Sequence, residues 1–234
     1  MKALILAAGY GNRISELTND NPKCLLPINN KPVIEYWIDK LVEINIDEII
    51  INTHYLHHKV EEFVNDSTFK DKVRIVYEPI LHGTAGTLYN CIDKFINDEI
   101  LLLHADNFGY VNLVDFLEYH HKRPKKCVLT MLTFKTSKPH ESGIVKVDED
   151  NVLIDFFEKK KEFNGFQANG AMYIISKELI KNFKNDFNDV FDIAKEVIPK
   201  LLNKIYVYPF EGMFFDIGDL KTYNFVNKNF KKIK

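Results

Sequence analysis

The sequence contains little cysteine and no long apolar run, and both absences restrict what the protein can be. Its three cysteines, Cys24, Cys91 and Cys127, stand far apart in 234 residues, without the CxxC spacing of zinc or redox sites. No stretch reaches the ~18 apolar residues of a transmembrane helix, and the short apolar run after Met1 ends at Gly9. We therefore expect reduced core thiols and a cytoplasmic protein that is neither exported nor inserted in a membrane.

The chain also lacks a strong charge of one sign and any biased composition. A formal net charge of -2 gives no electrostatic reason to bind nucleic acid, although a small basic pocket for phosphates remains possible. With 46% hydrophobic and 27% charged residues and no internal repeat, the composition is typical of a globular protein. We predict a single domain over residues 1–234.

The first half of the chain alternates between short apolar runs and segments with helical periodicity. The runs at 3–8, 48–52, 73–77 and 100–103 are predicted strands, and the segments 33–44, 56–64, 87–95 and 113–121 are predicted helices. This alternation favours parallel strands with helices on both faces, because right-handed crossovers place them there.

The pattern changes after Lys125. Predicted strands at 128–134, 144–147, 152–157 and 171–175 follow with few helices between them, which indicates a mixed or antiparallel extension of the sheet. A helix at 190–202, strands at 205–208 and 213–216, and a last helix from 220 to about 231 complete the prediction. The predicted fold is therefore α/β, a Rossmann-like three-layer α/β/α arrangement with a mixed, mainly parallel central sheet.

A glycine turn follows the first predicted strand, in the segment Leu6-Ala7-Ala8-Gly9-Tyr10-Gly11-Asn12-Arg13. Gly9 and Gly11 allow backbone N–H groups to approach an anion, and α/β folds bind nucleotides at the carboxyl ends of parallel strands. The turn is neither a Walker loop, since no Gly-Lys-Ser/Thr follows, nor a dinucleotide fingerprint. Alone, it would indicate only an ordinary connection from strand to loop.

A second motif, Pro22-Lys23-Cys24-Leu25-Leu26-Pro27, follows the turn at a short separation. Together the two resemble the sugar-1-phosphate nucleotidyltransferase family, which includes mannose- and heptose-1-phosphate guanylyltransferases and glucose-1-phosphate thymidylyltransferases. The resemblance extends along the chain through Gly83-Thr84-Ala85-Gly86, Asp106-Asn107, Gly143-Ile144-Val145, Glu158-Lys159, Asn169-Gly170 and Phe215-Asp216-Ile217-Gly218.

The resemblance implies transfer of a nucleotidyl group from a nucleoside triphosphate to a sugar 1-phosphate, with pyrophosphate released. The nucleotide-binding part would cover about residues 1–125 and the sugar-phosphate-binding part about 126–234. The implied catalytic residues are Arg13, Lys23, Asp106 and Asp216. The implied nucleotide-binding residues are Leu6, Ala8, Gly9, Gly11, Asn12, Arg13, Lys23, Glu78, Gly83, Thr84 and Ala85.

The resemblance also implies a metal ion and a sugar subsite. Asp106 and Asp216 are similar to the family's metal-binding aspartates, and two carboxylates suit Mg²⁺, which completes its octahedron with phosphate and water. Contacts to the sugar phosphate are implied for Asn107, Gly143, Glu158, Lys159 and Asn169. The chain departs from the family in having Lys160 after Glu158-Lys159, where proline is usual. Since relatives are often dimers or tetramers, a homo-oligomer is favoured.

This chemistry needs few residues, because the attacking phosphate oxygen is already anionic at pH 7 and needs no base. Charge repulsion is the main barrier, and a metal with Arg and Lys side chains reduces it. Two other readings stay open: a non-catalytic regulator that binds a nucleotide sugar, and a cytidylyltransferase for a non-sugar phosphate. Retention of the charged residues favours the enzyme, and the later motifs favour a sugar phosphate.

The preference for a base depends on Glu78, six residues before Thr84. This position resembles the family's base reader, where relatives that use thymidylyl or uridylyl groups often have glutamine. An ionised carboxylate accepts hydrogen bonds and cannot donate them, so it matches the N1–H and N2–H₂ donors of guanine. GTP is therefore the expected nucleotide, with UTP or dTTP as the alternative. If Glu78 instead faces water at a strand end, it has no such role.

Overall fold

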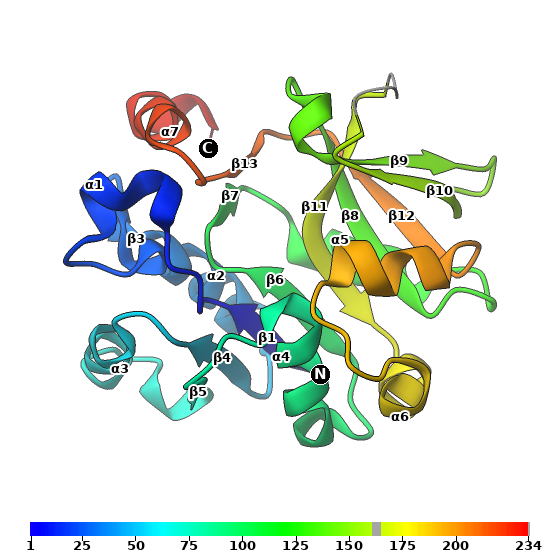
Figure 1. The fold of residues 1–234 in the computed structure, drawn as a ribbon, viewed down its shortest axis with the longest axis horizontal. Helices are drawn as coiled ribbons and strands as arrows, with labels where there is room; N and C mark the ends of the chain where they lie inside the picture. The colour runs from blue at the N-terminus through cyan, green and yellow to red at the C-terminus, as the bar shows by residue number, and fades with distance from the viewer. Residues whose placement is uncertain (161–164, 234) are drawn as a thin grey trace. The chain divides into compact units, whose positions relative to one another are not determined.

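The computed structural model describes residues 1–160 and 165–233 (Figure 1). The chain forms two compact units. Unit 1 comprises residues 1–81, 103–110 and 213–234, and unit 2 comprises residues 82–102 and 111–212. Strand β6 (Ile100–His104) carries the chain from unit 2 into unit 1. The division of roles near residue 125 stays a prediction.

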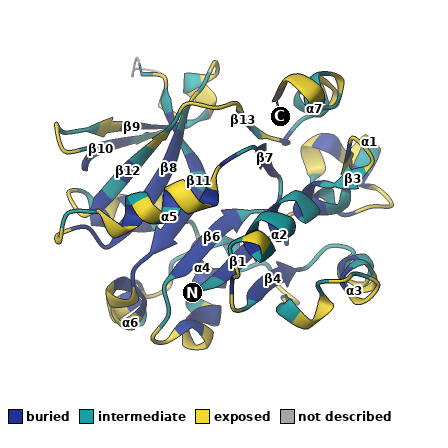
Figure 2. Cartoon of the chain, turned by 180° about the vertical axis from the view of Figure 1, so that it is seen from behind, coloured by how far each residue is buried: buried dark blue, intermediate teal, exposed yellow. Residues whose placement is uncertain are grey.

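Parallel strands form the centre of unit 1. Ile51 of β4 pairs with Ile5 of β1 and with Ile75 of β5, and all five residues of β4 are buried. Figure 2 shows the buried strands in dark blue. Such strands are continuous apolar runs because helices or loops cover both of their faces. The strands of unit 1 are β1 (Lys2–Leu6), β2 (Pro27–Ile28), β3 (Lys31–Pro32), β4 (Ile49–Thr53), β5 (Val73–Tyr77), β7 (Asn107–Gly109) and β13 (Phe214–Asp216).

Helices and short turns connect these strands. The helices are α1 (Ser15–Thr18), α2 (Val33–Glu43), α3 (His57–Asn65) and α7 (Leu220–Ile233), with 3-10 turns at Asn12–Ile14, Lys23–Leu25 and Lys70–Lys72. A buried cluster joins the N-terminal segment, β7 and α7 within unit 1: Ile28, Val33, Phe108, Ile217 and Val226. This packing holds the C-terminal residues Ile217 and Val226 against Ile28 and Val33 near the N-terminus.

Antiparallel pairing dominates unit 2, as the second half of the sequence indicates. Strand β8 (Leu129–Lys135) pairs antiparallel with β11 (Gln167–Ile175), and β9 (Gly143–Val147) pairs antiparallel with β10 (Leu153–Glu158). Strand β12 (Ile205–Phe210) runs parallel to β8. The helices are α4 (Gly83–Cys91), α5 (Leu113–His121) and α6 (Lys177–Asp186), with 3-10 turns at Ile92–Phe95 and Pro139–Glu141.

The predicted helix at 190–202 is helical only over residues 193–201 and is not a regular α-helix. The segment forms a π-helical turn at Ile193–Val197 and a 3-10 turn at Ile198–Leu201. Pro199 has no N–H and therefore cannot donate the bond that a regular α-helix needs. The Asp192 side chain accepts from the Lys195 N–H at 3.0 Å, which fixes the start of the turn.

Helix α4 begins four residues before the predicted start at Thr87, and α6 was not predicted. Two glycines in the Gly83–Gly86 segment lower its intrinsic helix propensity, so periodicity alone did not indicate a helix there. Tertiary bonds stabilise the first turn: the Ala85 N–H donates to the Phe191 carbonyl at 3.0 Å, and Thr84 Oγ1 accepts from the Ile193 N–H at 2.8 Å.

The predicted α/β class is confirmed, with a mixed sheet and helices on both of its sides. Among the described residues, none of the helices is both long and apolar enough to span a membrane.

Candidate active site

Two short strands bring distant carboxylates together in unit 1. In the antiparallel pair of β7 and β13, Asp216 is the partner of Asn107. The Ile217 N–H also donates to the backbone carbonyl of Asp106 at 2.9 Å. The strand pair therefore places Asp106, immediately before β7, beside Asp216 at the end of β13.

Two cations from the N-terminal segment meet these carboxylates. Lys23 begins a 3-10 turn, and its Nζ donates a hydrogen bond to Asp106 Oδ2 and lies 3.5 Å from Asp216 Oδ1. Arg13 Nη2 lies 3.6 Å from Asp216 Oδ2. We call Arg13, Lys23, Asp106 and Asp216 the charge cluster. Its members are the four residues that the sequence predicts as catalytic.

Exposure differs strongly within the charge cluster. The side chain of Lys23 is 11% exposed and that of Asp106 is 27% exposed, whereas those of Asp216 and Arg13 are 57% and 72% exposed. Lys23 and Asp106 therefore form the inner pair of the cluster. Asp216 and Arg13 form its solvent-facing side, where a charged ligand has access.

The neighbouring charges alter the pKa values of the cluster. Burial works against the charge on Lys23, but the attraction of Asp106 and then Asp216 outweighs it, so the pKa of Lys23 is raised. Burial likewise opposes ionisation of Asp106, but Lys23 holds the pKa of this carboxyl below its usual value. Partial burial and the negative charge of Asp106 raise the pKa of Asp216. Lys23 and Asp106 are therefore both charged at neutral pH.

The glycine turn lies at the carboxyl end of β1. Strand β1 ends at Leu6, earlier than predicted, and the Leu6 carbonyl accepts from the Ala105 N–H at 2.9 Å. Ala8 is buried, while a Cβ at Gly9 would meet none of the described atoms within 4 Å. Gly11 has a φ of 70° and starts the turn that carries Asn12 and Arg13. The open space over Gly9 leaves the backbone of the turn accessible to a ligand.

Glu78 does not face water. It follows β5, is 4% exposed, and its Oε1 accepts from Asn52 Nδ2 at 3.2 Å. The alternative in which Glu78 is a solvated residue at a strand end is therefore wrong. A buried carboxylate without partners is costly, and Asn52 supplies one.

The remaining predicted nucleotide-binding residues lie in unit 2, at the start of α4. Gly83 has a φ of 71°, and a Cβ there would lie 2.7 Å from the Phe191 ring. Thr84 and Ala85 follow in the same first turn, which the Phe191 segment holds by the two hydrogen bonds given above. The loop is thus fixed by contacts that only glycine permits at position 83.

Three of the predicted sugar-site residues lie together in unit 2. Glu158 of β10 pairs with Gly143 of β9, and a Cβ at Gly143 would overlap the Glu158 carboxylate. Lys159 Nζ lies 3.6 Å from Glu158 Oε1. Close packing of the carboxylate over Gly143 leaves the lysine, 62% exposed, as the outward group.

The other two predicted sugar-site residues have hydrogen bonds within their own unit. The Asn169 amide donates to the Tyr173 hydroxyl at 2.7 Å, and its oxygen accepts from the Ala171 N–H at 2.9 Å, across an irregularity in β11. Asn107 lies in unit 1, buried, and its carbonyl accepts from Trp37 Nε1 at 2.7 Å. Both residues stabilise backbone geometry next to predicted site residues.

Asn52 and His54, at the end of β4, were not predicted from the sequence. Asn52 contacts Glu78, and His54 Nδ1 lies 2.6 Å from the backbone carbonyl of Glu78. The sequence does contain an indication of Asn52, because this polar residue comes directly after the apolar run Ile49-Ile50-Ile51. A buried amide at a strand end needs a specific partner.

The charge cluster has a donor set that suits a hard divalent cation. Asp106 and Asp216 present carboxylate oxygens on both sides of the Lys23 ammonium, which is itself a cation between them. The described residues contain no group of three or more His, Cys, Asp or Glu side chains arranged to hold a metal ion. Two carboxylates are compatible with Mg²⁺, which fills its other positions with phosphate and water oxygens.

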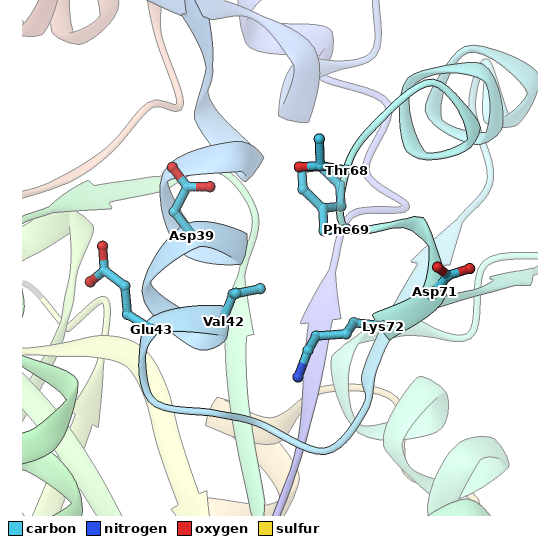
Figure 3. Close-up of a pocket in the computed structure, with 7 residues that line it drawn as sticks. All are labelled: Asp39, Val42, Glu43, Thr68, Phe69, Asp71 and Lys72. Atoms are coloured by element: carbon cyan, nitrogen blue, oxygen red, sulfur yellow. The ribbon is translucent and has the colours of Figure 1, made fainter.

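A pocket of about 450 Å³ lies elsewhere in unit 1 (Figure 3). It is lined by Asp39, Val42, Glu43, Thr68, Phe69, Asp71 and Lys72. Asp39 pairs with Lys31, and Lys72 Nζ donates to the Ile46 carbonyl at 3.2 Å. The pocket contains none of the residues predicted from the sequence, and we assign it no ligand.

The family model described as nucleotidyl transferase matches residues 2–232. The chain belongs to this family.

Relatives within the nucleotidyl transferase family differ in the nucleotide that their names specify. A Sulfolobus acidocaldarius protein provisionally named mannose-1-phosphate guanyltransferase is 27% identical over 100% of this chain and 64% of its own length. A glucose-1-phosphate adenylyltransferase of Fervidobacterium nodosum is 28% identical over 94% of this chain and 59% of its own length. The chain therefore spans about three fifths of the length of these curated relatives.

A solved structure supports the fold. The structure of a Bacillus anthracis protein, provisionally named glucose-1-phosphate thymidylyltransferase and determined in complex with sucrose, is similar with a TM-score of 0.85. It is 22% identical, and the match covers 100% of this chain and 96% of that one. The nucleotidyltransferase fold of unit 1 and unit 2 follows from this similarity.

Proposed function

We propose that this protein transfers a nucleotidyl group from a nucleoside triphosphate, with GTP favoured, to a sugar 1-phosphate. The observation that carries the proposal is the charge cluster, in which four residues from separate parts of the chain converge at a glycine turn. Two cations beside two carboxylates suit a reaction between phosphates.

In the proposed reaction, an oxygen of the sugar phosphate attacks the α-phosphorus of the triphosphate. A new phosphorus–oxygen bond forms, and the bond from the α-phosphorus to the pyrophosphate oxygen breaks, so that pyrophosphate leaves with the electron pair. The attacking oxygen is anionic at pH 7 and no proton has to be removed. Arg13, the exposed cation of the cluster, would bind the phosphates, and Lys23 would stabilise the charge that develops near the α-phosphate.

We include Mg²⁺ in the proposal, held by Asp106 and Asp216. The two carboxylates lie close enough together for one ammonium group to contact both. When bound, the ion would neutralise phosphate charge and polarise the phosphoryl oxygens. The low pKa of Asp106 supports this role, because a metal ligand must be ionised.

GTP is favoured because Glu78 is buried, hydrogen-bonded and at the end of β5. An ionised carboxylate only accepts hydrogen bonds, which matches the two donors on the edge of guanine. The Sulfolobus relative is named for guanylyl transfer, whereas others are named for adenylyl or thymidylyl transfer. The sugar phosphate would bind in unit 2 at Gly143, Glu158 and Lys159, with Asn169 supporting the strand beside them.

A pyrophosphate-release assay tests the proposal. Purified protein is given GTP, UTP, dTTP, CTP or ATP with a panel of sugar 1-phosphates, in Mg²⁺ or with a chelator. We expect release that requires a sugar phosphate and Mg²⁺ and is fastest with GTP. Lys23→Ala should reduce kcat by about 10²- to 10³-fold, as expected for loss of a transition-state donor. Lys181→Ala, an exposed lysine on α6, is the matched control.

The outcomes separate the candidate functions. No release with any combination would reject the enzyme in favour of a regulator that only binds nucleotide sugars. Release that is fastest with UTP or dTTP would retain the reaction and reject the guanine preference.

A further inference from the structure

The end of β4 connects the glycine turn to Glu78 through side chains that are almost completely buried. Asn52 and Glu78 are 3% and 4% exposed, respectively. The Glu78 N–H donates to the Thr53 carbonyl at 2.8 Å, which fixes the backbone of Glu78 against β4. Two polar side chains in such a place require defined hydrogen bonds, so their orientation is restricted.

The orientation of the Asn52 amide follows from its neighbours. The backbone N–H of Ala7 can only donate, and it lies 2.8 Å from Asn52 Oδ1. The opposite end of the amide, Nδ2, is therefore the end that faces Glu78 Oε1 at 3.2 Å. Rotating the amide by 180° would place donor against donor and acceptor against acceptor, so this orientation is fixed by chemistry.

A second chain of bonds runs parallel to the first. His54 Nδ1 lies 2.6 Å from the Glu78 carbonyl oxygen, which can only accept, so Nδ1 carries the proton. In the neutral ring, His54 Nε2 then accepts from the Tyr10 hydroxyl at 2.8 Å. Tyr10 lies in the glycine turn, as Ala7 lies at its start. Both the backbone and the side chain of Glu78 are thus anchored to the turn.

We propose that Asn52 is a positioning residue for nucleotide selection. It donates a hydrogen bond to residue 78 and thereby determines which hydrogen-bonding groups of residue 78 face the base. The inference rests on the proposed function, in which Glu78 contacts the base. With Asn52 as donor, a carboxylate at position 78 presents acceptors, as guanine needs. A glutamine there would turn its carbonyl oxygen to Asn52 and present its NH₂ group instead. Because Asn52 supplies a fixed donor, exchanging glutamate for glutamine at position 78 changes the group that faces the base from an acceptor to a donor.

Three variants test this assignment. Asn52→Asp has nearly the same shape and keeps the acceptor for the Ala7 N–H, but it replaces the donor to Glu78 with a carboxylate oxygen. Asn52→Asp combined with Glu78→Gln restores the hydrogen bond in the opposite direction, with residue 78 as donor and residue 52 as acceptor. The carbonyl oxygen of the introduced glutamine is then left for the base. Thr53→Val is the matched control, because the buried Thr53 hydroxyl has no hydrogen-bond partner within residues 1–160 and 165–233.

The readout is the ratio of Kd values for GTP and UTP, measured by equilibrium dialysis of the full chain, with thermal unfolding recorded for every variant. We expect the wild type and Thr53→Val to prefer GTP equally. Asn52→Asp should lose about tenfold or more of this preference, the loss typical of one hydrogen bond to a charged group. The double variant should prefer GTP more strongly than either Asn52→Asp or Glu78→Gln alone. If Asn52→Asp does not fold, Asn52→Ala replaces it in the comparison with Thr53→Val.

Three results would overturn the assignment: no GTP preference in the wild type, an unchanged ratio in the Asn52 variants, or a double variant no better than the single ones. A purely structural role would alter the unfolding temperature and leave the ratio unchanged. Failure of the proposed function is distinguishable, since it is an absence of pyrophosphate release with every substrate pair. Wild-type turnover combined with a base ranking that ignores Asn52 would reject this inference alone.

Discussion

Replacing Asp106 with asparagine should destabilise the fold more than the same replacement at Asp216. Both changes preserve the shape of the side chain, and each removes one negative charge from the surroundings of Lys23. Lys23 is nearly buried and donates directly to Asp106, whereas Asp216 is 3.5 Å from its Nζ and more than half exposed. The inner pair therefore contributes most of the electrostatic stabilisation.

The magnitude follows from the separation and the exposure of the charges. Two unit charges 3.5 Å apart attract by about 5 kcal/mol at an effective dielectric constant of about 20, before desolvation and ordering costs. Exposed pairs retain about 0–1 kcal/mol of this, and breaking a fully buried pair costs about 3–5 kcal/mol. The Lys23–Asp106 pair lies between these cases, so we expect a loss of about 1–3 kcal/mol for Asp106→Asn and at most about 1 kcal/mol for Asp216→Asn.

The difference should be visible in thermal unfolding without metal or nucleotide. For a chain of this length, 1 kcal/mol corresponds to about 2–4 °C in Tm, so Asp106→Asn should lower Tm by about 2–12 °C and Asp216→Asn by no more than about 4 °C. Adding Lys23→Met to Asp106→Asn should restore part of the loss, because no buried charge then lacks its partner.

The pH dependence provides a second readout. The folded pKa of Asp106 is lowered, so its stabilisation is complete above the unfolded pKa of about 3.9 and is lost as pH falls through the folded value. The Tm values of wild type and Asp106→Asn should therefore converge in acid. An equal or larger loss for Asp216→Asn, or a gap that persists when Asp106 is protonated, would refute this account of the charge cluster.

Three further predictions concern unit 2 and the cysteine beside Lys23. Gly83→Ala should lower the free energy of unfolding by about 2 kcal/mol or more in a denaturant titration, because the introduced alanine must adopt a positive φ and its Cβ overlaps Phe191. A variant as stable as the wild type would contradict this packing. A hydrogen bond from His120 lowers the pKa of Glu99 to about 2, so Glu99→Gln should reduce stability above pH 4.3 or so and match wild type near pH 2; a constant difference across pH would exclude this cause. Burial raises the pKa of the Cys24 thiol to about 12, so iodoacetamide should label Cys24 only after unfolding, and labelling of the native protein, located by peptide mass spectrometry, would disprove its burial.

Strong local patterns explain which parts of the fold could be predicted from the sequence. The buried run at Ile49–Thr53 and the helix at Leu113–His121 follow directly from apolar periodicity. The segment after Val190 has similar periodicity, yet Pro199 and the bonds of Asp192 and Glu196 divide it into a π-helical and a 3-10 turn. Such a result depends on which side chains meet, and periodicity does not contain that information.

The charged residues of the site could be identified from the sequence, but their arrangement could not. Motif spacing indicates Arg13, Lys23, Asp106 and Asp216, whereas the pairing of β7 with β13 is what brings the two carboxylates to one lysine. Asn52 belongs to no motif that the resemblance contains. Its proposed role rests on the direction of its amide, which the bond from the Ala7 N–H indicates.

The charge cluster also explains why overall charge is a poor guide to this protein. The net charge of -2 gives no indication of where a phosphate could bind. Within unit 1, however, two cations from the N-terminal segment and two carboxylates from distant parts of the chain meet in one place, and their charges cancel. Cancellation keeps Lys23 charged although it is nearly buried, while the more exposed Arg13 lies on the solvent side beside the open glycine turn. A sum over the sequence hides this arrangement, because each cation is matched by a carboxylate that only the fold places next to it.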